Sequence, residues 1–392
     1  MSLAIVAVGY NRPKGMKRLL DSIGNATYMT SDIPLIVSID ESDQSDAVEQ
    51  VAREFDWKYG TKEIRRFSER QGLRKHIVQC GDYSEKYGGV IILEDDLVVA
   101  NDFYVYASRA HEKYSEDERV CGVSLYSYNI NVFTRFAFSP APSLYDVYLG
   151  DMVVTWGQSW TCKQWQKFKN WYLEHEDKLP AINIKLPREI SNWTRSWGRY
   201  FANYIVDCGL SYVYPYVSRT TCFSDAGEHN KSVAPITFVQ VPLMNGIPNE
   251  YRFGNYDELI RYDSFFERKL DHRCQISGIS GDMICMDTGN MKTSADGKKY
   301  VISNEELPHK KVASFALLLR PICLNALNEY PGNQLHLYQL ETDEIRPWNK
   351  KNMRYYSNRC RLRYENFDMP WRKAFIYGLK EFLCRFRESL KH

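Results

Sequence analysis

The chain has 392 residues, of which 44% are hydrophobic and 26% are charged. This composition supplies enough apolar side chains for a sizeable core and excludes a globally disordered chain. The net charge is only +2, but residues 346–392 hold 13 Lys and Arg against 4 Asp and Glu, a surplus of +9. The preceding 345 residues therefore carry −7, which argues against a general nucleic-acid binder and indicates an anionic partner for the basic end.

The cysteine pattern and the lengths of the apolar segments indicate the cellular compartment of the protein. None of the ten cysteines forms a Cys-x-x-Cys pair or a Cys/His spacing typical of zinc sites, so we expect reduced thiols. The apolar start reaches Gly9 and Pro13 too early for a signal peptide. Since no run approaches the ~20 apolar residues of a membrane span, we expect a cytoplasmic protein that does not cross a membrane by itself.

The first hundred residues alternate between strand and helix patterns. Continuous apolar runs predict three buried strands, at Leu3–Val8, Pro34–Ile39 and Gly89–Leu93. Apolar residues at helical spacing, or a short segment between glycines, predict three helices, at Lys14–Ile23, Ser45–Phe55 and Gly72–Gly81. This βαβαβ alternation predicts an α/β fold whose parallel strands are covered by helices on both faces.

The pattern is looser in the remaining chain. It predicts further helices at Phe103–Tyr114, Trp156–Trp171 and Ser196–Cys208, and further strands at Val120–Leu125, Leu210–Tyr216 and Leu335–Leu340. The aromatic residues of 126–148 and 156–171 are candidates for a surface on which a ligand stacks, although such rings more often fill a core.

Polar clusters follow each of the three apolar strands. Asn11 and Arg12 follow the first strand, Asp40 follows the second, and Glu94-Asp95-Asp96 follows the third. Ligands of parallel α/β sheets bind beyond the carboxyl ends of the strands, so we expect these side chains to face one crevice. The acidic cluster suits a divalent cation held between the protein and a diphosphate.

Other sequence features narrow the kind of ligand. Arg12 and the run Arg74-Lys75-His76 could supply cations and hydrogen-bond donors to a phosphorylated ligand. Neither a Gly-x-x-x-x-Gly-Lys-Ser/Thr loop nor a Gly-x-Gly-x-x-Gly fingerprint occurs, which argues against ATPases and dinucleotide-dependent enzymes.

Four motifs in order resemble those of GT-A fold glycosyltransferases: Ile5–Pro13, Val37–Asp40, Gly72–His76 and Ile92–Val99. The likeness is to the N-acetylglucosaminyltransferases of N-glycan branching and to bacterial glycosyltransferases of surface-polysaccharide synthesis. It covers roughly residues 3–235. The resemblance implies a GT-A, Rossmann-like mixed sheet with helices on both faces.

The resemblance also implies roles at the donor site. Arg12, beside Asn11, would contact the diphosphate, and Asp40 would contact the uracil. Either Arg74 or His76 would contact the ribose and phosphate.

The acidic cluster and a later loop complete the implied donor site. Asp96 would coordinate Mn²⁺ or Mg²⁺, while Glu94 and Asp95 would shape the donor-sugar site. His229 would lie in a loop that closes over the donor.

The sequence differs from the family pattern at the position expected for the general base. Inverting members carry an acidic residue before or within a Trp-containing helix, which deprotonates the acceptor hydroxyl. The matching stretch, Asn192–Arg199, holds no carboxylate. Glu189 is the first candidate because it is near in sequence, and Asp151 is the second.

These observations predict a metal-dependent, inverting glycosyltransferase that moves a sugar from a nucleotide-sugar, UDP-linked, to a glycan or glycolipid acceptor in surface-polysaccharide synthesis. The alternatives are a sugar nucleotidyltransferase, disfavoured because Gly9 is the only glycine of its loop, and a non-catalytic nucleotide-sugar-binding relative. We expect a nucleotide-sugar-binding half at 1–100, an acceptor-binding half at 101–235, an accessory α/β extension at 236–345 and a basic amphipathic tail at 346–392.

The tail has its own predicted partner. Apolar residues recur there at steps of three or four among basic ones, at Trp371, Phe375, Leu379, Phe382, Leu383, Phe386 and Leu390. A basic amphipathic helix suits the anionic inner face of a plasma membrane. The alternative is that this stripe packs on the protein's own body or in a dimer.

Overall fold

The computed structural model describes residues 3–134, 136–178, 181, 183–223 and 239–347, with short stretches between 371 and 383. The chain forms two compact units. The first comprises residues 1–129 and 140–269, and the second comprises 130–139 and the chain from 270 onward. The first two predicted parts, 1–100 and 101–235, thus fall almost wholly within one unit.

The first unit is built on a ten-stranded sheet with the order β12-β11-β7-β9-β6-β8-β4-β1-β2-β3. Its strands are β1 (Ala4–Gly9), β2 (Leu35–Ile39), β3 (Lys62–Arg66), β4 (Gly89–Glu94), β6 (Val120–Ser124), β7 (Val147–Gly150), β8 (Gln158–Thr161), β9 (Ser211–Pro215), β11 (Arg261–Tyr262) and β12 (Arg268–Lys269). A separate two-stranded ladder joins β5 (Leu97–Val99) to β10 (Thr220–Cys222).

The strand directions decide which loops share an edge. β4, β1, β2 and β3 are mutually parallel, with Val6 paired to Ile36 on one side and to Ile92 on the other. β8 runs antiparallel to β4 and to β6, and β9 is parallel to β6. The carboxyl ends of β1, β2, β4, β6 and β9 therefore lie along one edge of the sheet, which we call the carboxyl edge.

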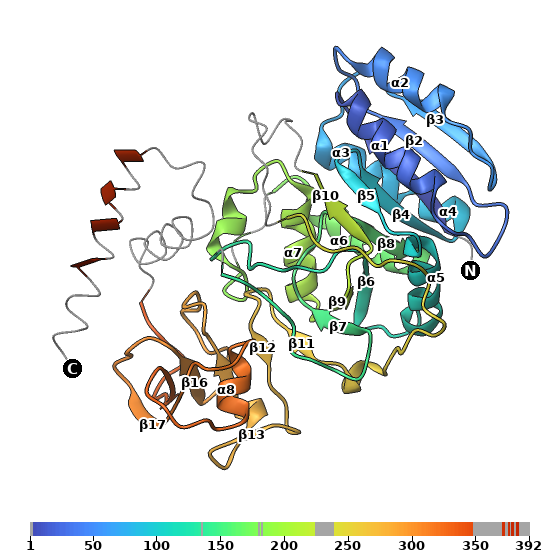
Figure 1. The fold of residues 1–392 in the computed structure, drawn as a ribbon. Coiled ribbons are helices and arrows are strands. Elements are labelled where there is room, and N and C mark those ends of the chain that lie inside the picture. The colour runs from blue at the N-terminus through green and yellow to red at the C-terminus, as the bar shows by residue number, and fades with distance from the viewer. Residues whose placement is uncertain are drawn as a thin grey trace. The chain divides into compact units, whose positions relative to one another are not determined.

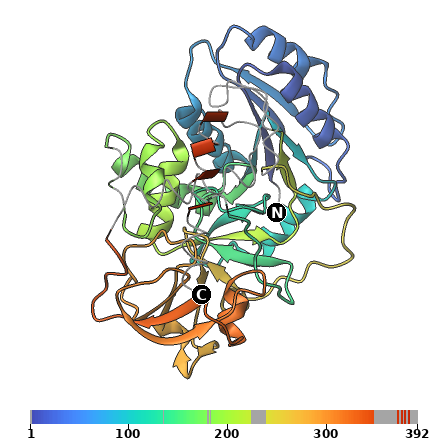
Figure 2. The ribbon, with the colours of Figure 1, turned by 60° about the vertical axis from the view of Figure 1, so that its left-hand side comes forward.

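Helices cover both faces of this sheet (Figures 1 and 2). Their bounds are α1 (Pro13–Gly24), α2 (Ser45–Glu54), α3 (Leu73–Gly81), α4 (Tyr83–Tyr87), α5 (Phe103–Tyr114), α6 (Cys162–His175) and α7 (Trp197–Asp207), with 3-10 helices η1 (Arg188–Asn192) and η2 (Tyr256–Glu258). On one face, α1, α2 and α5 share a core with alternate residues of β1, β2 and β4. On the other face, α6 and α7 pack with Trp160 of β8. The predicted α/β class, with a mixed sheet and helices on both faces, is confirmed.

One sequence expectation was wrong in detail, and one strand was not predicted. Residues 156–171 are not one helix, because Trp160 lies in β8 and α6 starts only at Cys162, where Thr161 forms a capping box with Gln164. The edge strand β3 was not predicted, since its sequence Lys-Glu-Ile-Arg-Arg lacks an apolar run. Charged side chains are common on edge strands, where they discourage further pairing.

The second unit contains a four-stranded sheet in the order β15-β16-β18-β17. Its elements are β13 (Gln275–Ile276), β14 (Ile279–Ser280), η3 (Gly281–Met283), β15 (Ile284–Met286), β16 (Tyr300–Ser303), β17 (Lys310–Phe315), α8 (Cys323–Leu327) and β18 (Leu335–Gln339). Val301 and Tyr338 lie in its small core. The predicted strand at Leu335–Leu340 corresponds to β18.

Within the described parts of the chain, no helix has the length and apolar character needed to span a bilayer. The eight cysteines in those parts, from Cys80 to Cys323, are all free thiols. Most of the predicted tail lies outside the described residues.

Candidate functional site

The carboxyl edge brings the three predicted strand ends together. The amide of Asp40 donates to the carbonyl of Gly9 at 2.9 Å, and the hydroxyl of Ser42 donates to the carbonyl of Tyr10 at 2.8 Å. The amide of Tyr10 in turn donates to Asp95 Oδ2 at 3.4 Å. The end of β1 is thereby linked to the loop after β2 and to the acidic turn after β4.

Arg12 contacts the acidic turn directly. Its guanidinium forms an ion pair with Asp95, and its Nη1 lies 3.3 Å from Asp96 Oδ2. Burial lowers the pKa of this guanidinium, but the charges of Asp95, Asp96 and Glu94 outweigh that and raise the pKa above its ordinary value.

The backbone around Arg12 is tightly packed against the same turn. A Cβ added to Gly15, in the first turn of α1, would lie 2.5 Å from the carbonyl oxygen of Asp95. Only glycine fits this close approach. The carbonyl of Arg12 accepts a hydrogen bond from the amide of Met16 at 2.9 Å, which fixes the start of α1.

The three acids of the turn differ in their electrostatic state. Burial raises the pKa of Asp95 to about 6, against the opposing charge of Arg12. Burial and the charges of Asp96 and Asp95 raise the pKa of Glu94 well above its ordinary value. Asp96 Oδ1 is buried and has no hydrogen-bond partner among the described residues.

This arrangement fits a divalent cation that shares its ligands with a substrate. An unpartnered carboxylate oxygen is a ligand that Mg²⁺ and Mn²⁺ accept readily. The described residues contain no group of three or more His, Cys, Asp or Glu side chains that could hold a metal ion. Asp96 would thus hold a cation only together with diphosphate oxygens and water, which is the usual arrangement for Mg²⁺ bound with a phosphorylated substrate.

Asp40 is already engaged with the backbone. Its carboxylate accepts from the amides of Gln71 at 2.7 Å, Gly72 at 2.9 Å and Glu41 at 2.9 Å, and the residue is only 3% exposed. Gly72 has a φ of 74°, a conformation that favours glycine, and α3 begins at the next residue. Asp40 therefore holds the start of α3 against the end of β2.

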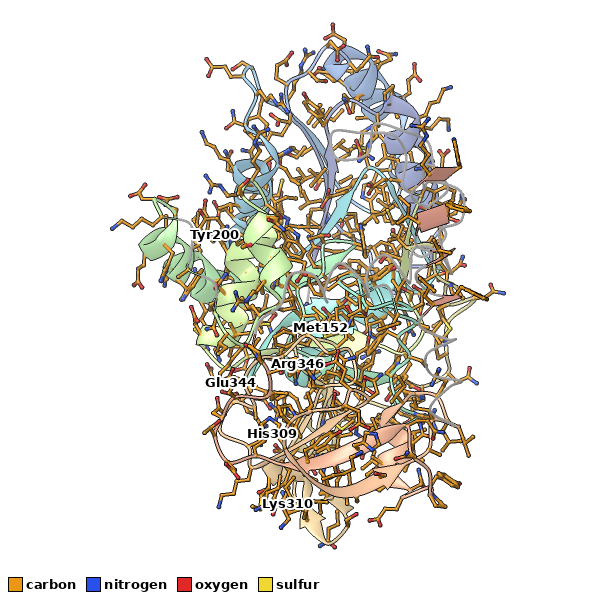
Figure 3. The ribbon with its side chains drawn as sticks, turned by 90° about the vertical axis from the view of Figure 1, so that its left-hand side faces the viewer. Met152, Tyr200, His309, Lys310, Glu344 and Arg346 are labelled. Atoms are coloured by element: carbon orange, nitrogen blue, oxygen red, sulfur yellow. The ribbon has the colours of Figure 1, made fainter. Side chains whose placement is uncertain are left out.

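The structure separates the two candidates on α3. The ring of His76 is 2% exposed, its Nε2 lies 2.7 Å from the hydroxyl of Ser38, and burial lowers its pKa to about 4. Arg74 is only half-buried, and its Nη1 donates to the hydroxyl of Tyr200 on α7 at 2.7 Å. Figure 3 shows Tyr200 on this helix. Of the two side chains, only that of Arg74 is exposed enough to contact a ligand.

The two candidate bases differ in their surroundings. β7 is antiparallel to β9, so Asp151, directly after β7, lies at the edge opposite the carboxyl ends, four strands away from β4. At ~4.8 Å per strand this is about 19 Å to the side. Both of its carboxylate oxygens are engaged, at 2.7 Å from Ser211 Oγ and 2.7 Å from Lys269 Nζ. The structure thus does not bring Asp151 to the acidic turn, which corrects the prediction that it is an alternative base.

Glu189 lies on a different element. It lies in η1, just before α7, and the first turn of α7 is close to Thr155, ahead of the start of β8. The start of β8 faces the end of β4. Burial raises the pKa of Glu189, and its Oε2 is buried without a hydrogen-bond partner in the described part of the chain.

The remaining predicted residues are less informative. Asn11 is half-buried between Tyr10 and Arg12. His229 lies outside the described residues. Trp160 and Trp165 are fully buried, with ring centroids 5.0 Å apart, so they belong to the core and form no sugar-binding platform.

Sequence reasoning missed the ladder beside Asp96. Phe223, which follows β10, donates its amide to the carbonyl of Asp96 at 2.8 Å, and β10 pairs with β5 directly after the acidic turn. A buried ion pair between Arg219 and Asp102, at 3.2 Å, joins the segments next to these two strands. No local pattern signals this ladder, because its strands have three residues each and lie more than 100 positions apart.

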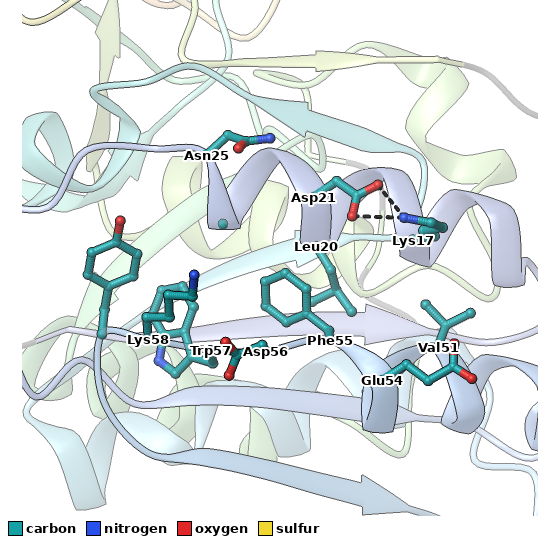
Figure 4. Close-up of a pocket in the computed structure, with 12 residues that line it drawn as sticks. Lys17, Leu20, Asp21, Asn25, Val51, Glu54, Phe55, Asp56, Trp57 and Lys58 are labelled. Carbon is teal, nitrogen blue, oxygen red and sulfur yellow. Dashed lines mark hydrogen bonds and ion pairs between the residues drawn. The ribbon is translucent and has the colours of Figure 1, made fainter.

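A separate groove lies away from this site. It has a volume of about 650 Å³ and is lined by α1 residues, including Lys17 and Asp21, by Val51 and by residues 54–59 (Figure 4). It includes Gly24 at the last turn of α1, and none of the predicted site residues lines it.

Comparisons with known proteins add a fold-level likeness. No protein-family model matches the chain, and no curated protein sequence matches it. Among solved structures, S. aureus TarS 1-349 with UDP-GlcNAc is 11% identical, with a TM-score of 0.37, over 61% of this chain and 63% of that one. GalNAc-T7 with UDP, GalNAc and Mn²⁺ is 12% identical, with a TM-score of 0.40, over 60% and 46% of the two chains. The mannosyltransferase PcManGT from Pyrobaculum calidifontis, with GDP-Man and Mn²⁺, is 14% identical, with a TM-score of 0.33, over 54% of each chain.

These three alignments each span less than two thirds of the solved chain. At this level of similarity the likeness assigns no activity or substrate to the present chain.

Proposed function

We propose that this protein is a metal-dependent, inverting glycosyltransferase that uses a nucleoside diphosphate sugar, UDP-linked, as its donor. The observation that carries the proposal is the turn after β4. There a buried, unpartnered oxygen of Asp96 and the ion-paired guanidinium of Arg12 lie together at the edge where β1, β2 and β4 end. An acidic ligand for a cation beside a fixed positive charge suits a diphosphate carrying its own metal ion.

The reaction breaks the bond between the anomeric carbon and the diphosphate oxygen, and forms a bond from that carbon to an acceptor oxygen. Asp96 would hold the cation, which when bound neutralises charge on the departing diphosphate. Arg12 and Arg74 would bind phosphate oxygens, and Glu189 would take the proton of the acceptor hydroxyl. The unpartnered oxygen and raised pKa of Glu189 support the role of base and disfavour a non-catalytic relative.

For the acceptor, we propose only its chemical class. A glycan or glycolipid of surface-polysaccharide synthesis, reached from the inner face of a membrane through the basic tail, fits the +9 charge of residues 346–392.

The proposal is tested by replacing the metal ligand. Asp96→Asn should abolish transfer and leave the fold intact, because a neutral amide is a much poorer ligand for a hard cation. Release of UDP or GDP from nucleotide-sugars in the presence of Mn²⁺ measures the activity, and EDTA should reproduce the loss in the unaltered protein. Asp21→Asn, an exposed change on α1 at the Lys17 ion pair, is a matched control and should retain activity. Full activity of Asp96→Asn, or activity in excess chelator, would refute the metal-dependent transferase.

A further inference from the structure

Arg12 offsets part of the negative charge of the acidic turn in this structure. One side chain bridges two carboxylates, Asp95 and Asp96, and the side chain of Asp95 is almost fully buried. A guanidinium keeps its charge at any physiological pH and can contact two oxygens at once. The negative charge that would attract a cation is therefore partly offset from within the chain.

The two oxygens of Asp96 are not equivalent. Oδ2 lies 3.3 Å from Arg12 Nη1, whereas Oδ1 is buried without a partner among the described residues. A divalent cation on this carboxylate would lie within a few ångströms of the guanidinium, and like charges at that distance repel strongly in a partly buried site. Mn²⁺ alone and the present Arg12 contact thus oppose each other.

A diphosphate removes this opposition. Its oxygens offer the guanidinium a two-point contact at least as favourable as the carboxylates, and they also supply ligands to the cation. Only the side chain has to move, since the backbone of Arg12 is held by Met16 and by the close contact between Gly15 and Asp95.

We propose that Arg12 is a built-in counter-ion of Asp96, which gives way to the divalent cation only when a nucleoside diphosphate takes up the guanidinium. The inference rests on the proposed function and adds a regulation to that site. Because binding couplings are reciprocal, metal and nucleotide should each strengthen the binding of the other. The free protein should bind the metal weakly and so avoid holding a cation without its substrate.

The test measures Mn²⁺ binding rather than activity. Electron paramagnetic resonance of free Mn²⁺, with the full chain and no nucleotide, should show that Arg12→Gln binds Mn²⁺ about 5- to 10-fold more tightly than the unaltered protein, at the low end of usual coupling factors. The gain in Mn²⁺ affinity on adding UDP or GDP should shrink in the same variant. Arg66→Gln is the matched control, because Arg66 lies at the end of β3 and pairs with Glu41, Asp46 and Glu49 instead.

A second variant guards against loss of folding. Arg12→Lys keeps the charge, but one ammonium bridges two carboxylates poorly, so Mn²⁺ alone should again bind more tightly than to the unaltered protein. Equal or weaker Mn²⁺ binding by both variants would overturn the counter-ion role while leaving the proposed function standing. Failure of the proposed function looks different: the unaltered protein would bind no nucleotide with Mn²⁺, or Asp96→Asn would leave Mn²⁺ binding unchanged.

Discussion

Glu189 is the residue on which the chemical step of the proposed reaction depends. Glu189→Gln should lower turnover by about 10²–10⁴-fold, the usual cost of removing a general base, with little change in donor affinity. The physical reason is that the amide is nearly isosteric but cannot accept the hydroxyl proton. Turnover is measured with acceptor present, and donor affinity by calorimetry with UDP.

The control for this variant is Glu174→Gln, on the exposed side of α6. It removes the same charge from a nearby helix and should leave turnover unchanged. A normal rate in Glu189→Gln would show that the base lies elsewhere, and Asp151 would not be the replacement because Ser211 and Lys269 engage it at the opposite edge.

Single residues of the site were predictable to the extent that they follow strands. Arg12, Asp40 and the acidic turn each come directly after an apolar run, and parallel strands bring such positions to one edge. The state of each side chain was not predictable, because it depends on distant partners. His76 is neutral through burial beside Ser38, and Asp151 is remote because β7 runs antiparallel.

At the scale of elements, the loop between β3 and α3 depends on Asp40. Asp40→Ala should weaken UDP binding, and the contacts give two reasons. The substitution removes the carboxylate that, by the family resemblance, would contact the uracil of the donor. It also leaves the amides of Gln71 and Gly72 without their acceptor, and these hydrogen bonds fix the start of the helix that carries Arg74. Leaving buried amides unsatisfied costs about 1–3 kcal/mol, so the melting temperature should fall as well.

Calorimetry with UDP and a thermal melt check this together. Ser42→Ala is a nearby control, since Ser42 bonds to the carbonyl of Tyr10 and contacts neither Gln71 nor Gly72. A lowered melting temperature with unchanged UDP affinity would mean that Asp40 only anchors the helix. Mn²⁺ affinity should change less than UDP affinity, because Asp96 lies on a different loop.

A helix or strand was predictable where its own residues carry an apolar pattern, and was missed where its pairing depends on distant residues. α1 was predictable because Met16, Leu19, Leu20 and Ile23 recur at helical spacing, and all four are buried. β8 was misread because Trp156, Trp160 and Trp165 happen to fit a helical face, whereas Trp160 fills the core from a strand. β3 and the β5–β10 ladder escaped prediction since their pairing is set by tertiary contacts rather than by an apolar run.

At the scale of the whole molecule, the charge is unevenly distributed along the chain. The +9 of residues 346–392 accompanies an apolar stripe, and the described side chains of Trp371, Phe375 and Phe382 are exposed. Exposed aromatic rings among basic residues suit the interface of an anionic membrane, at roughly 1 kcal/mol per basic residue near the surface. A glycosyltransferase whose acceptor is carried on a lipid would gain from this placement.

Removing residues 368–392 should therefore abolish cosedimentation with vesicles that contain anionic lipid, while transfer to a water-soluble acceptor should persist. The intact chain should sediment with such vesicles at low salt and less at high salt, because screening weakens the attraction of the basic residues. Replacing Trp371 and Phe375 by Ser keeps the net charge of the tail and tests the contribution of its apolar side chains. This variant should bind the vesicles more weakly than the intact chain at both salt concentrations. If the intact chain stays in the supernatant at low salt, the tail does not bind a membrane, and its apolar stripe must instead be covered by the protein itself or by a second copy. A deletion that lowers the melting temperature or splits a dimer would distinguish these two cases.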